Sequence, residues 1–456
     1  MERRDFIKIS GAGALALGAA AVGCAPKKKT APAAAAEEGP EQMVYRENPV
    51  NGDKVSLIGF GCMRWPMVEK DGKRVIDQEA VNEMVDYALE HGINYFDTSP
   101  AYLMGQSEKA AGIALSRHPR DKYFIATKLS NFNNQTPEAS IQMYRDSFDQ
   151  LKTDYFDYYL LHSIGSGGVE AFRKRYVDNG MMEFLIKEKE AGRIRNLGFS
   201  FHGSPSDFDS LIALHDNGEY HWDFVQIEMN YVDWNHADGR RNANASYLYE
   251  ELDKRGIPIV IMEPLQGGRL ARVADSVANL LKERDPEASL ASWAFRFVGS
   301  YPRVLTVLSG MVYLEHLQDN LRTFMDFQPL TEEEKIFLDT EVAGLMANYP
   351  TVNCNDCKYC MPCPYGIDIP GIFMHYNEAV NHAKVAQSVE QENYRELKRA
   401  YLVSYDRAVP TLRQASHCVG CKQCIPKCPQ SIQIPRELRR IDAYVEKLKQ
   451  NTLSSE

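Results

Sequence analysis

The chain has 456 residues, of which 44% are hydrophobic, and it carries a formal net charge of −10 with an isoelectric point near 5.7. This length exceeds that of a usual single domain, so we expect one large domain with an addition. The acidic balance and the lack of a basic stripe argue against nucleic acid as a partner. After the N-terminal segment no apolar run reaches about 18 residues, so no internal membrane span is expected.

Residues 1–24 are predicted to be an export signal. The run RRDFIK, which starts at Arg3, is a twin-arginine motif, and an apolar, Gly/Ala-rich stretch follows it. The sequence AVGC, ending at Cys24, resembles a lipobox that would leave Cys24 lipidated at the mature N-terminus. We therefore expect export by the twin-arginine route to the periplasm or the outer face of the membrane, with attachment only through Cys24. Residues 25–43, with their lysines, alanines and prolines, are predicted to be a disordered linker.

Residues 44–345 alternate strand-like and helix-like patterns eight times. Eight βα units of this length predict a closed parallel (β/α)8 barrel, whose chemistry lies on the loops at the C-terminal ends of the strands. A doubly wound sheet is the alternative, but the lack of a glycine-rich G-x-G-x-x-G turn favours the barrel. The strand-like runs are VSLIGFGCM (from Val55), YFDTS (Tyr95), YFIATKL (Tyr123), FDYYLLHS (Phe156), NLGFSFHG (Asn196), FVQIEMNY (Phe224), PIVIMEPL (Pro258) and VLTVLSG (Val304).

The helices between these strands show recognisable start and stop signals. The first is predicted to begin after Asp77 and to stop at Gly92, with apolar residues on one side at the helical period. Another is predicted to begin at Thr136, an N-cap residue directly before Pro137. The apolar positions of the first helix are Val81, Met84, Val85, Ala88 and Leu89.

Residues 346–456 have a different composition and are predicted to form a second, cysteine-rich domain. The run CNDCKYCMPCP is followed by a polar spacer over residues 372–416, predicted to be helical, and then by CVGCKQCIPKCP. Another charged helix is expected from Pro435 onward. The eight cysteines of the two runs are Cys354, Cys357, Cys360, Cys363, Cys418, Cys421, Cys424 and Cys428.

The cysteine spacing predicts two 4Fe-4S clusters. Three cysteines spaced by two residues, with a fourth before proline, form the ligand set of bacterial ferredoxins, in which the fourth cysteine serves the other cluster. Zinc is an alternative, but zinc ribbons use two cysteine pairs and would leave half of these thiols idle. Disulfides are another, although repeated C-x-x-C spacing suits them poorly. By this logic Cys428 would join the first three cysteines and Cys363 the last three. The shorter spacing before Cys363 leaves this crossover open.

Four polar residues at the ends of three consecutive strands predict a catalytic site. Asp97 and Tyr102 lie at the end of the second predicted strand, Lys128 at the end of the third and His162 at the end of the fourth, so all four are expected at the catalytic rim. A phenol has a reference pKa of about 10, and a neighbouring ammonium is expected to lower it while a carboxylate holds that ammonium in place. A neutral histidine can then orient a carbonyl oxygen for reduction.

Over about residues 45 to 435 the chain resembles the aldo/keto reductases, in particular the subgroup with a C-terminal ferredoxin-type domain. The resemblance implies a catalytic tetrad of Asp97, Tyr102, Lys128 and His162, with Tyr102 as the general acid. It also implies hydride transfer from a nicotinamide, NADP or NAD, that lies across the mouth of the barrel. The matching motifs are GFGCMR (from Gly59), FDTSPAY, ATK, LLH, GFS, VQIEMNY and the closing LSGM with a later DN pair.

The same resemblance implies the residues that contact the nicotinamide cofactor. Ser200 and Gln226 should hold the carboxamide. The pyrophosphate segment runs from Pro264 through Leu265 to Gly268, and Asp319 and Asn320 should lie at the adenine end. Four positions depart from the family pattern and leave the choice between NADP and NAD open. Phe201 replaces an Asn, Met262 a stacking Tyr, and Gly310 and His316 the basic residues that clamp the 2′-phosphate.

Two functions follow from these observations. The first is a nicotinamide-dependent reductase that converts a small carbonyl substrate to an alcohol and carries two clusters. The second is an exported electron-transfer or scaffold protein whose barrel no longer turns over nicotinamide. A redox partner protein is expected if the clusters carry electrons, whereas clusters that only stabilise the fold would need none. The loop of Met63, Arg64 and Trp65 is expected to shape the substrate pocket, although the sequence does not identify the substrate.

Overall fold

The computed structural model describes residues 42–237, 242–347 and 349–454. The predicted twin-arginine motif, the lipobox at Cys24 and nearly all of the predicted linker lie outside these ranges. Tertiary contacts join the barrel and the cysteine-rich region within one unit, Glu41–Glu456. Among the described residues no helix is both long and apolar enough to cross a membrane.

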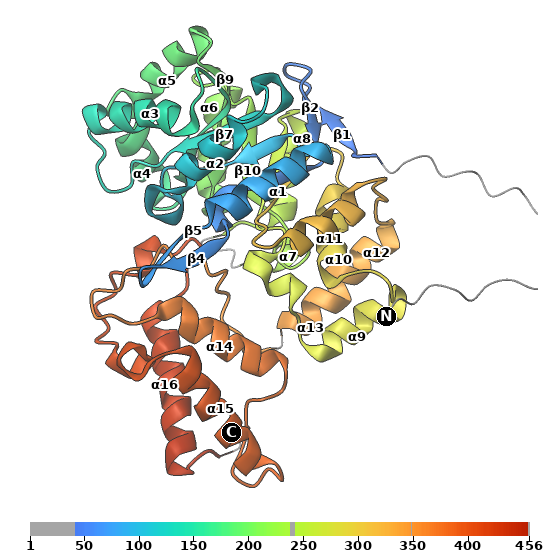
Figure 1. Cartoon of the computed structure of the whole chain (residues 1–456), viewed down its shortest axis with the longest axis vertical. Coiled ribbons are helices and arrows are strands. Elements are labelled where there is room, and N and C mark those ends of the chain that lie inside the picture. Colours follow the sequence, from blue (N-terminus) through green and yellow to red (C-terminus); the bar gives the residue numbers. More distant parts are fainter. Residues whose placement is uncertain (1–41, 238–241, 348, 455–456) are drawn as a thin grey trace, which may run out of the picture. The chain divides into compact units, whose positions relative to one another are not determined.

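The predicted barrel is confirmed. Eight parallel strands close on themselves in the order β10-β11-β12-β3-β6-β7-β8-β9 (Figure 1). Almost every strand residue is buried, because side chains on one face fill the barrel and those on the other pack against helices. The strands are β3 (Ile58–Gly61), β6 (Tyr95–Asp97), β7 (Phe124–Leu129), β8 (Phe156–Ile164), β9 (Ile194–Phe201), β10 (Phe224–Glu228), β11 (Ile259–Met262) and β12 (Val304–Ser309).

Helices follow the strands, and both predicted helix starts are confirmed. The side chain of Asp77 caps α1, and that of Thr136 caps α3 with Pro137 in the first turn. The barrel helices are α1 (Gln78–Glu90), α2 (Ser107–Leu115), α3 (Pro137–Leu151), α4 (Gly168–Phe172), α5 (Met181–Glu190), α6 (Pro205–Asp216), α7 (Asp233–His236), α8 (Ala245–Lys254), α9 (Asp275–Arg284), α10 (Leu290–Gly299), α11 (Leu314–Phe324), α12 (Glu332–Phe337) and α13 (Ala343–Ala347).

The first strand-like run is divided in the structure. Its beginning forms β2 (Lys54–Ser56), which pairs antiparallel with β1 (Tyr45–Glu47), and only the following β3 enters the barrel. Its end, Cys62–Arg64, is a short 3-10 turn that leads to the barrel mouth. One continuous strand was therefore the wrong expectation, because a buried apolar run does not reveal where the chain changes direction.

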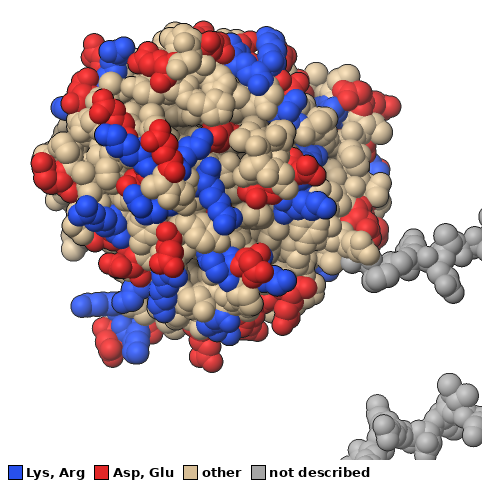
Figure 2. Space-filling model, turned by 90° about the horizontal axis from the view of Figure 1, so that it is seen from above, with Lys and Arg blue, Asp and Glu red and all other residues tan. Residues whose placement is uncertain are grey.

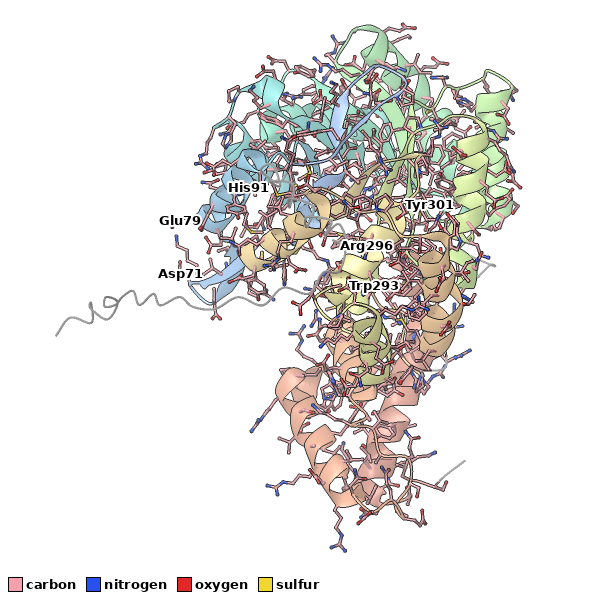
Figure 3. All side chains as sticks on the ribbon, turned by 90° about the vertical axis from the view of Figure 1, so that its right-hand side faces the viewer. Asp71, Glu79, His91, Trp293, Arg296 and Tyr301 are labelled. Carbon is pink, nitrogen blue, oxygen red and sulfur yellow. The ribbon has the colours of Figure 1, made fainter. Side chains whose placement is uncertain are left out.

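A second hairpin, β4 (Met67–Lys70) and β5 (Lys73–Ile76), follows this turn. Asp71 and Gly72 form its tip, and both have positive φ angles, 52° and 69°. Figure 3 shows Asp71 at the tip of this projecting hairpin. The Asp-Gly pair is a strong signal for such a turn, so this hairpin was readable from the sequence.

The cysteine-rich region is helical with a core of its own, as predicted. Its helices are α14 (Ile369–Asn381), α15 (Tyr394–Ala408) and α16 (Ile434–Gln450). Buried side chains from all three helices form a hydrophobic cluster separate from the barrel core. The first two helices cover much of the predicted helical spacer, and α16 is the predicted C-terminal charged helix.

On the face shown in Figure 2, acidic and basic side chains are interspersed rather than segregated. Long basic side chains also cover apolar surface on the outer helices. On α10, for example, the Arg296 guanidinium lies 5.6 Å from the Trp293 ring centroid (Figure 3). This face shows no extended basic stripe of the kind that binds nucleic acid.

Candidate active site

A buried ion pair forms the base of the site. The Lys128 Nζ donates to Asp97 Oδ1 at 2.5 Å and to the Thr98 carbonyl at 2.9 Å. Both side chains are almost wholly buried because they project from the ends of the neighbouring strands β6 and β7. Burial raises the pKa of Asp97 and lowers that of Lys128, while the attraction between the two charges opposes both changes.

Tyr102 lies directly beside this pair. The Lys128 Nζ is 4.9 Å from the Tyr102 ring centroid, and only 8% of the tyrosine surface is exposed. Leu103 and Met104 follow it with left-handed φ angles of 49° and 56°, a strained conformation for side chains of this size.

Overall the pKa of Tyr102 is raised, so the nearby Lys128 does not bring it below its ordinary value as the sequence led us to expect. Burial raises the pKa of the Tyr102 phenol well above 10, and the Asp97 carboxylate raises it further. The lysine donates its hydrogen bonds to Asp97 and Thr98, and none joins it to the phenol among the described residues. Tyr102 is therefore protonated at neutral pH, as a general acid must be.

His162 completes the predicted tetrad at an irregularity in β8. Pairing with β9 shifts register between Leu161 and Ile164, and Ser163 has a φ of 52°. The rings of Tyr102 and His162 meet edge to face with centroids 5.8 Å apart. The structure therefore brings all four predicted catalytic residues together.

Burial and nearby positive charges keep His162 neutral. Its pKa is well below 6.5, chiefly through burial and then through Lys128 and Arg175. The His162 Nδ1 lies 2.6 Å from Ser130 Oγ and 3.2 Å from Ser99 Oγ, and the two hydroxyls are 2.8 Å apart. With Nδ1 as an acceptor, the Ser130 hydroxyl donates to Nδ1 and the Ser99 hydroxyl donates to Ser130, which satisfies the two shorter contacts. This assignment places the ring proton on Nε2. Sequence reasoning missed both serines, although Ser99 ends the second strand-like run and Ser130 directly follows the third.

The two residues predicted to hold a nicotinamide carboxamide lie side by side. The register of β9 and β10 pairs Ser200 with Gln226, and both side chains are buried. Ser200 Oγ accepts from the Ser163 backbone N–H at 2.8 Å. Within the part of the chain that the structure describes, Gln226 Oε1 is buried without a hydrogen-bond partner. An unpaired buried carbonyl oxygen is costly, so this position fits an amide N–H from a bound group.

The segment predicted to bind pyrophosphate is partly covered. Gly267 and Gly268 have φ angles of 67° and 97°, and the Gly268 N–H donates to the Leu265 carbonyl at 2.9 Å. A Cβ on Gly267 would collide with the backbone of Asn355, which belongs to the first cysteine run. A Cβ on Gly268 would meet only the end of the Arg272 side chain, so the space beside this residue is open. The predicted segment from Pro264 to Gly268 therefore shares its surface with the cysteine-rich region.

The residues predicted for the adenine end already have partners within the protein. Asp319 accepts from Ser289 Oγ at 2.8 Å and lies 3.2 Å from Arg322. The buried Asn320 side chain donates to Ser309 Oγ at 2.9 Å. Asp319 remains partly exposed, whereas Asn320 holds the start of the loop after β12. Their contact with a cofactor stays a prediction.

The four departures from the family pattern occupy different surroundings. Phe201 packs against Phe208 in the barrel core, and Met262 ends β11. The Arg64 side chain packs on Gly310, in contact with the cysteine-rich region on its other side. His316 Nδ1 lies 3.4 Å from the Val312 backbone nitrogen.

The eight predicted ligand cysteines gather in two groups. Cys428 is an electrostatic neighbour of Cys354, Cys357 and Cys360. Cys363 is likewise a neighbour of Cys424, as are Cys418 and Cys421. Cys360 is also an electrostatic neighbour of Cys424, so the two sets adjoin, and the crossover of Cys363 and Cys428 stays a prediction. We call the set containing Cys428 the first thiol group and the set containing Cys363 the second thiol group.

These thiol groups fit clusters better than the alternatives. All the cysteines in the described ranges are free. No three His, Cys, Asp or Glu side chains in those ranges are close enough to bind a single metal ion. Ligands of a four-iron cluster surround a larger body than the ligands of one zinc ion do. The free thiols of the described cysteines argue against disulfides, and two runs of four cysteines match the ligand number of 4Fe-4S clusters.

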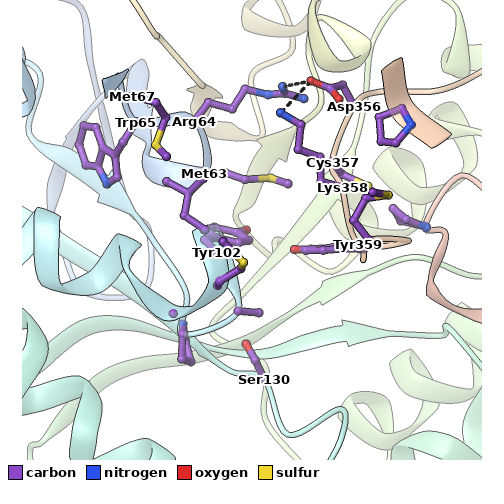
Figure 4. A pocket seen from close by; sticks show the side chains of 18 of the residues that line it. Met63, Arg64, Trp65, Met67, Tyr102, Ser130, Asp356, Cys357, Lys358 and Tyr359 are labelled. Atoms are coloured by element: carbon purple, nitrogen blue, oxygen red, sulfur yellow. Dashed lines mark ion pairs between the residues drawn. The ribbon is translucent and has the colours of Figure 1, made fainter. Parts of the chain in front are cut away.

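A pocket of about 1720 Å³ opens above Tyr102, and both regions of the chain line it. The barrel contributes Trp65, Tyr102 and Ser130, and the first cysteine run contributes Cys357 and Tyr359. Figure 4 shows Tyr102 and Tyr359 on facing sides of the pocket, with the Tyr359 hydroxyl directed toward Tyr102. The expectation that the loop of Met63, Arg64 and Trp65 shapes the pocket agrees with this lining.

Polar contacts hold the first cysteine run against the barrel. Arg64 donates to the Asn355 carbonyl and pairs with Asp356 at 3.5 Å. The Asn355 amide donates to Glu263 at 2.8 Å. These residues give no pattern in the sequence, because their partners lie about 90 to 290 positions away.

A second contact involves Glu228 at the end of β10. The Gln430 amide, two residues after Cys428, contacts both Glu228 carboxyl oxygens at 2.8 and 3.0 Å. Burial, followed by the nearby Asp233 and Glu263 carboxyls, raises the pKa of Glu228 well above its usual value. The first thiol group thus rests on acidic side chains at the barrel mouth.

Two family models match the sequence. The model of the aldo/keto reductase family matches residues 57–338, and a 4Fe-4S dicluster domain matches residues 353–433. Arabidopsis thaliana L-galactose dehydrogenase is 24% identical over 64% of this chain and 91% of its own. Escherichia coli methylglyoxal reductase YeaE is 34% identical over 59% of this chain and 86% of its own.

Solved structures share the barrel. The holo form of aldo-keto reductase AKR11C1 from Bacillus halodurans matches with a TM-score of 0.52 and 22% identity, covering 65% of this chain and 95% of that one. An aldo-keto reductase from Klebsiella pneumoniae in complex with NADPH matches with a TM-score of 0.51 and 23% identity, over 66% and 95%. At such identities the likeness shows the fold.

Proposed function

Because the chain belongs to the aldo/keto reductase family, we propose that this oxidoreductase reduces an aldehyde or ketone to an alcohol with a nicotinamide cofactor. The observation that carries the proposal is the cluster of Tyr102, Lys128, Asp97 and neutral His162 at the base of one large pocket. The bound nicotinamide would supply the hydride. Ser200 and the unpaired Gln226 would hold its carboxamide.

In this proposal the protein's own residues bind and protonate the carbonyl oxygen. Tyr102 donates its phenolic proton to that oxygen as negative charge develops there. The Nε2–H of neutral His162 donates a hydrogen bond to the same oxygen and orients it. Lys128, held by Asp97, stabilises the phenolate that Tyr102 becomes after it gives up its proton.

The pocket has room for a carbonyl substrate beside the nicotinamide of the proposed cofactor. Sites for drug-sized ligands occupy roughly 300 to 1,000 Å³, and this cavity of about 1720 Å³ is larger. Methionine and aromatic side chains, among them Met63, Trp65 and Phe132, supply an adaptable apolar lining. We therefore propose an aldehyde or ketone with an apolar group that contacts these side chains.

The deciding experiment is turnover by anaerobically prepared protein, screened with a carbonyl panel and with both NADPH and NADH. Tyr102→Phe keeps the ring and removes the proton donor, so kcat should fall at least about 10²-fold. Tyr365→Phe, at an exposed tyrosine outside the pocket, is the matched control and should keep wild-type turnover. Activity of Tyr102→Phe within a few-fold of wild type would remove this residue from the mechanism.

A second candidate is an iron–sulfur electron-transfer or scaffold protein whose barrel no longer turns over nicotinamide. The observation in its favour is the backbone of Asn355 against Gly267, on the segment predicted to bind pyrophosphate. Titration of the purified protein with NADPH and NADH, followed by cofactor fluorescence, separates the two candidates. Binding of neither nucleotide supports the second.

We further propose that the two thiol groups each hold one 4Fe-4S cluster. Eight free thiols in two groups of four support this number. Anaerobic protein should then contain about eight iron atoms per chain and absorb broadly near 400 nm. Zinc as the sole metal would contradict the proposal.

The remaining proposal concerns export. Clusters are assembled where thiols are kept reduced, so a loaded chain must cross the membrane folded, as twin-arginine substrates do. Arg3→Lys combined with Arg4→Lys keeps the charge but removes the guanidinium pair, and should leave loaded protein in the cytoplasm. Cys24→Ala should release exported protein from the membrane fraction. Normal export of the double variant would count against this proposal.

A further inference from the structure

The loop that follows β8 carries a buried arginine. Arg175 belongs to a π-helical segment, Arg173–Val177, that directly follows α4. Two consecutive side chains of this segment, Arg175 and Tyr176, are buried. Turns of this kind are rare and occur frequently at functional sites, and Arg175 also lines the pocket above Tyr102.

The Arg175 guanidinium donates only to neutral acceptors within the described ranges. Its Nη2 donates to the His162 carbonyl at 2.8 Å and to the Tyr176 hydroxyl at 2.6 Å. Its Nε donates to Asn131 Oδ1 at 3.2 Å, and its Nη1 donates to the Ser163 carbonyl at 3.3 Å. A guanidinium has five N–H groups, so these four bonds leave one N–H of Nη1 available. Ser163, the neighbour of Nη1, is itself part of the pocket lining.

Arg175 differs in charge balance from the other cations of the pocket lining, which have a carboxylate partner or are exposed to water. Arg64 and Arg413 belong to the first group, with ion pairs of 3.5 and 3.7 Å, and Arg74, Lys358 and Lys427 belong to the second. Arg175 is only 5% exposed, and no ion pair joins it to a carboxylate in the described part of the chain. A buried charge without a counterion is costly, so an anion bound in the pocket would stabilise this guanidinium.

Phe132 connects this guanidinium with the proposed catalytic residues. Its ring centroid is 4.6 Å from the Arg175 guanidinium carbon and 5.0 Å from the His162 ring centroid. The His162 ring in turn lies against the Tyr102 ring. Phe132 lines the pocket and is 38% exposed, so a substrate can pack on its ring. A molecule whose carbonyl reaches the Tyr102 hydroxyl can therefore extend over Phe132 toward Arg175.

We propose that Arg175 binds a carboxylate of the substrate, so that the protein reduces oxo acids in preference to neutral carbonyl compounds. This inference rests on the proposed reductase function and names its substrate class. The carboxylate accepts from the available Nη1 N–H and neutralises the buried guanidinium, while the carbon chain of the substrate packs on Phe132. Hydride adds to the carbonyl carbon and the Tyr102 proton to its oxygen, so the product is a hydroxy acid whose carboxylate is unchanged.

The test compares oxo acids with their neutral amides in steady-state kinetics of the anaerobic, cluster-loaded protein. Straight-chain ω-oxo acids of increasing length and the corresponding ω-oxo amides serve as substrates, because acid and amide have nearly the same shape. A charge-assisted hydrogen bond is about twice as strong as a neutral one, so kcat/KM for the acid should exceed that for the amide at least about fivefold at the preferred length. Equal values at every length, or a preference for the amides, would overturn the proposal.

A variant assigns the preference for acids to Arg175. Arg175→Met keeps much of the bulk of the side chain but removes its charge, and should lower the acid-to-amide ratio of kcat/KM to about one or below. Arg46 provides the matched control, because it is a partly buried arginine outside the pocket that also donates only to carbonyls, those of Gly299, Tyr301 and Val304. Arg46→Met should keep the wild-type ratio. An unchanged ratio in Arg175→Met, or an equal fall in both variants, contradicts a carboxylate site at Arg175.

A binding measurement separates failure of this inference from failure of the proposed reductase. Isothermal titration calorimetry with the saturated straight-chain acids and amides needs no turnover. If no carbonyl compound is reduced, the proposed function fails, whereas acids that bind more tightly than amides in wild type but not in Arg175→Met still support the anion site. Acids that bind no more tightly than amides overturn it. If Arg175→Met loses iron or does not fold, Arg175→Gln takes its place with the same expected loss, and the wild-type comparison decides if neither variant folds.

Discussion

The two sides of the pocket are built in different ways. On the barrel side Asp97, Tyr102, Lys128 and His162 are all at most 8% exposed, and burial controls their protonation. On the cysteine side the contacts are partly open to solvent, as in the ion pair of Arg64 with Asp356, whose side chains are 24% and 23% exposed. The proposed chemistry therefore lies on the buried barrel side, while the cysteine side should adjust substrate fit.

Removal of the buried Lys128 is the strongest test of this difference between the two sides of the pocket. Lys128→Met leaves the Asp97 carboxylate buried without its partner, and loss of one member of such a pair costs about 3 to 5 kcal/mol of unfolding free energy. Turnover should fall as well, because the phenolate formed from Tyr102 loses its neighbouring charge. Anaerobic chemical denaturation and steady-state kinetics measure the two effects.

An exposed lysine provides the control for this prediction. Lys254 pairs with Glu251 at 2.5 Å, but 62% of its side chain is exposed, so Lys254→Met should lower the unfolding free energy far less than Lys128→Met does. Equal losses for the two variants would mean that burial does not distinguish the catalytic pair from a surface pair.

The next prediction concerns pH and the buried Glu108 of α2. Burial raises the pKa of the Glu108 carboxyl to about 7 from 4.5, and Thr127 Oγ1 donates to it at 2.5 Å. Between these two values the folded protein holds a proton that the unfolded chain has lost, so stability falls as pH rises through this window. The full change corresponds to about 3 kcal/mol, and Glu108→Gln should remove it.

This prediction is checked by the difference in unfolding free energy between wild type and Glu108→Gln at pH 5 and pH 8. Wild type should lose stability relative to the variant as pH rises. An unchanged difference would show that the carboxyl titrates near its ordinary pKa in the folded protein.

The sequence predicted the barrel side well because strand ends carry local signals. Asp97, Lys128 and His162 each end an apolar run, and parallel strands bring such ends to one rim. The spacing of the cysteines likewise predicted the 4Fe-4S domain that a family model matches over residues 353–433. The helix caps at Asp77 and Thr136 were also local and were confirmed.

The features that the sequence did not reveal depend on distant partners or on burial. The contact of Gln430 with Glu228 joins residues 202 positions apart, and the sequence around either residue gives no sign of the other. The pKa of Tyr102 was expected to fall because a lysine was near. Burial is the larger effect and raises this pKa. The division of the first strand depended on a turn at Leu57, where no Gly or Pro marks the chain.

The smallest expected effect tests the cysteine side directly. Tyr359→Phe keeps the ring beside Cys360 but removes a hydroxyl directed into the pocket. One hydrogen bond to a bound substrate contributes about 1 kcal/mol, so KM should rise roughly two- to tenfold while kcat stays near wild type. Tyr365→Phe, on the same region but outside the pocket, should change neither, and iron content should match wild type in both. A fall in kcat as large as that of Tyr102→Phe would place the proton donor on the cysteine side, and the contrast between the two sides would fail.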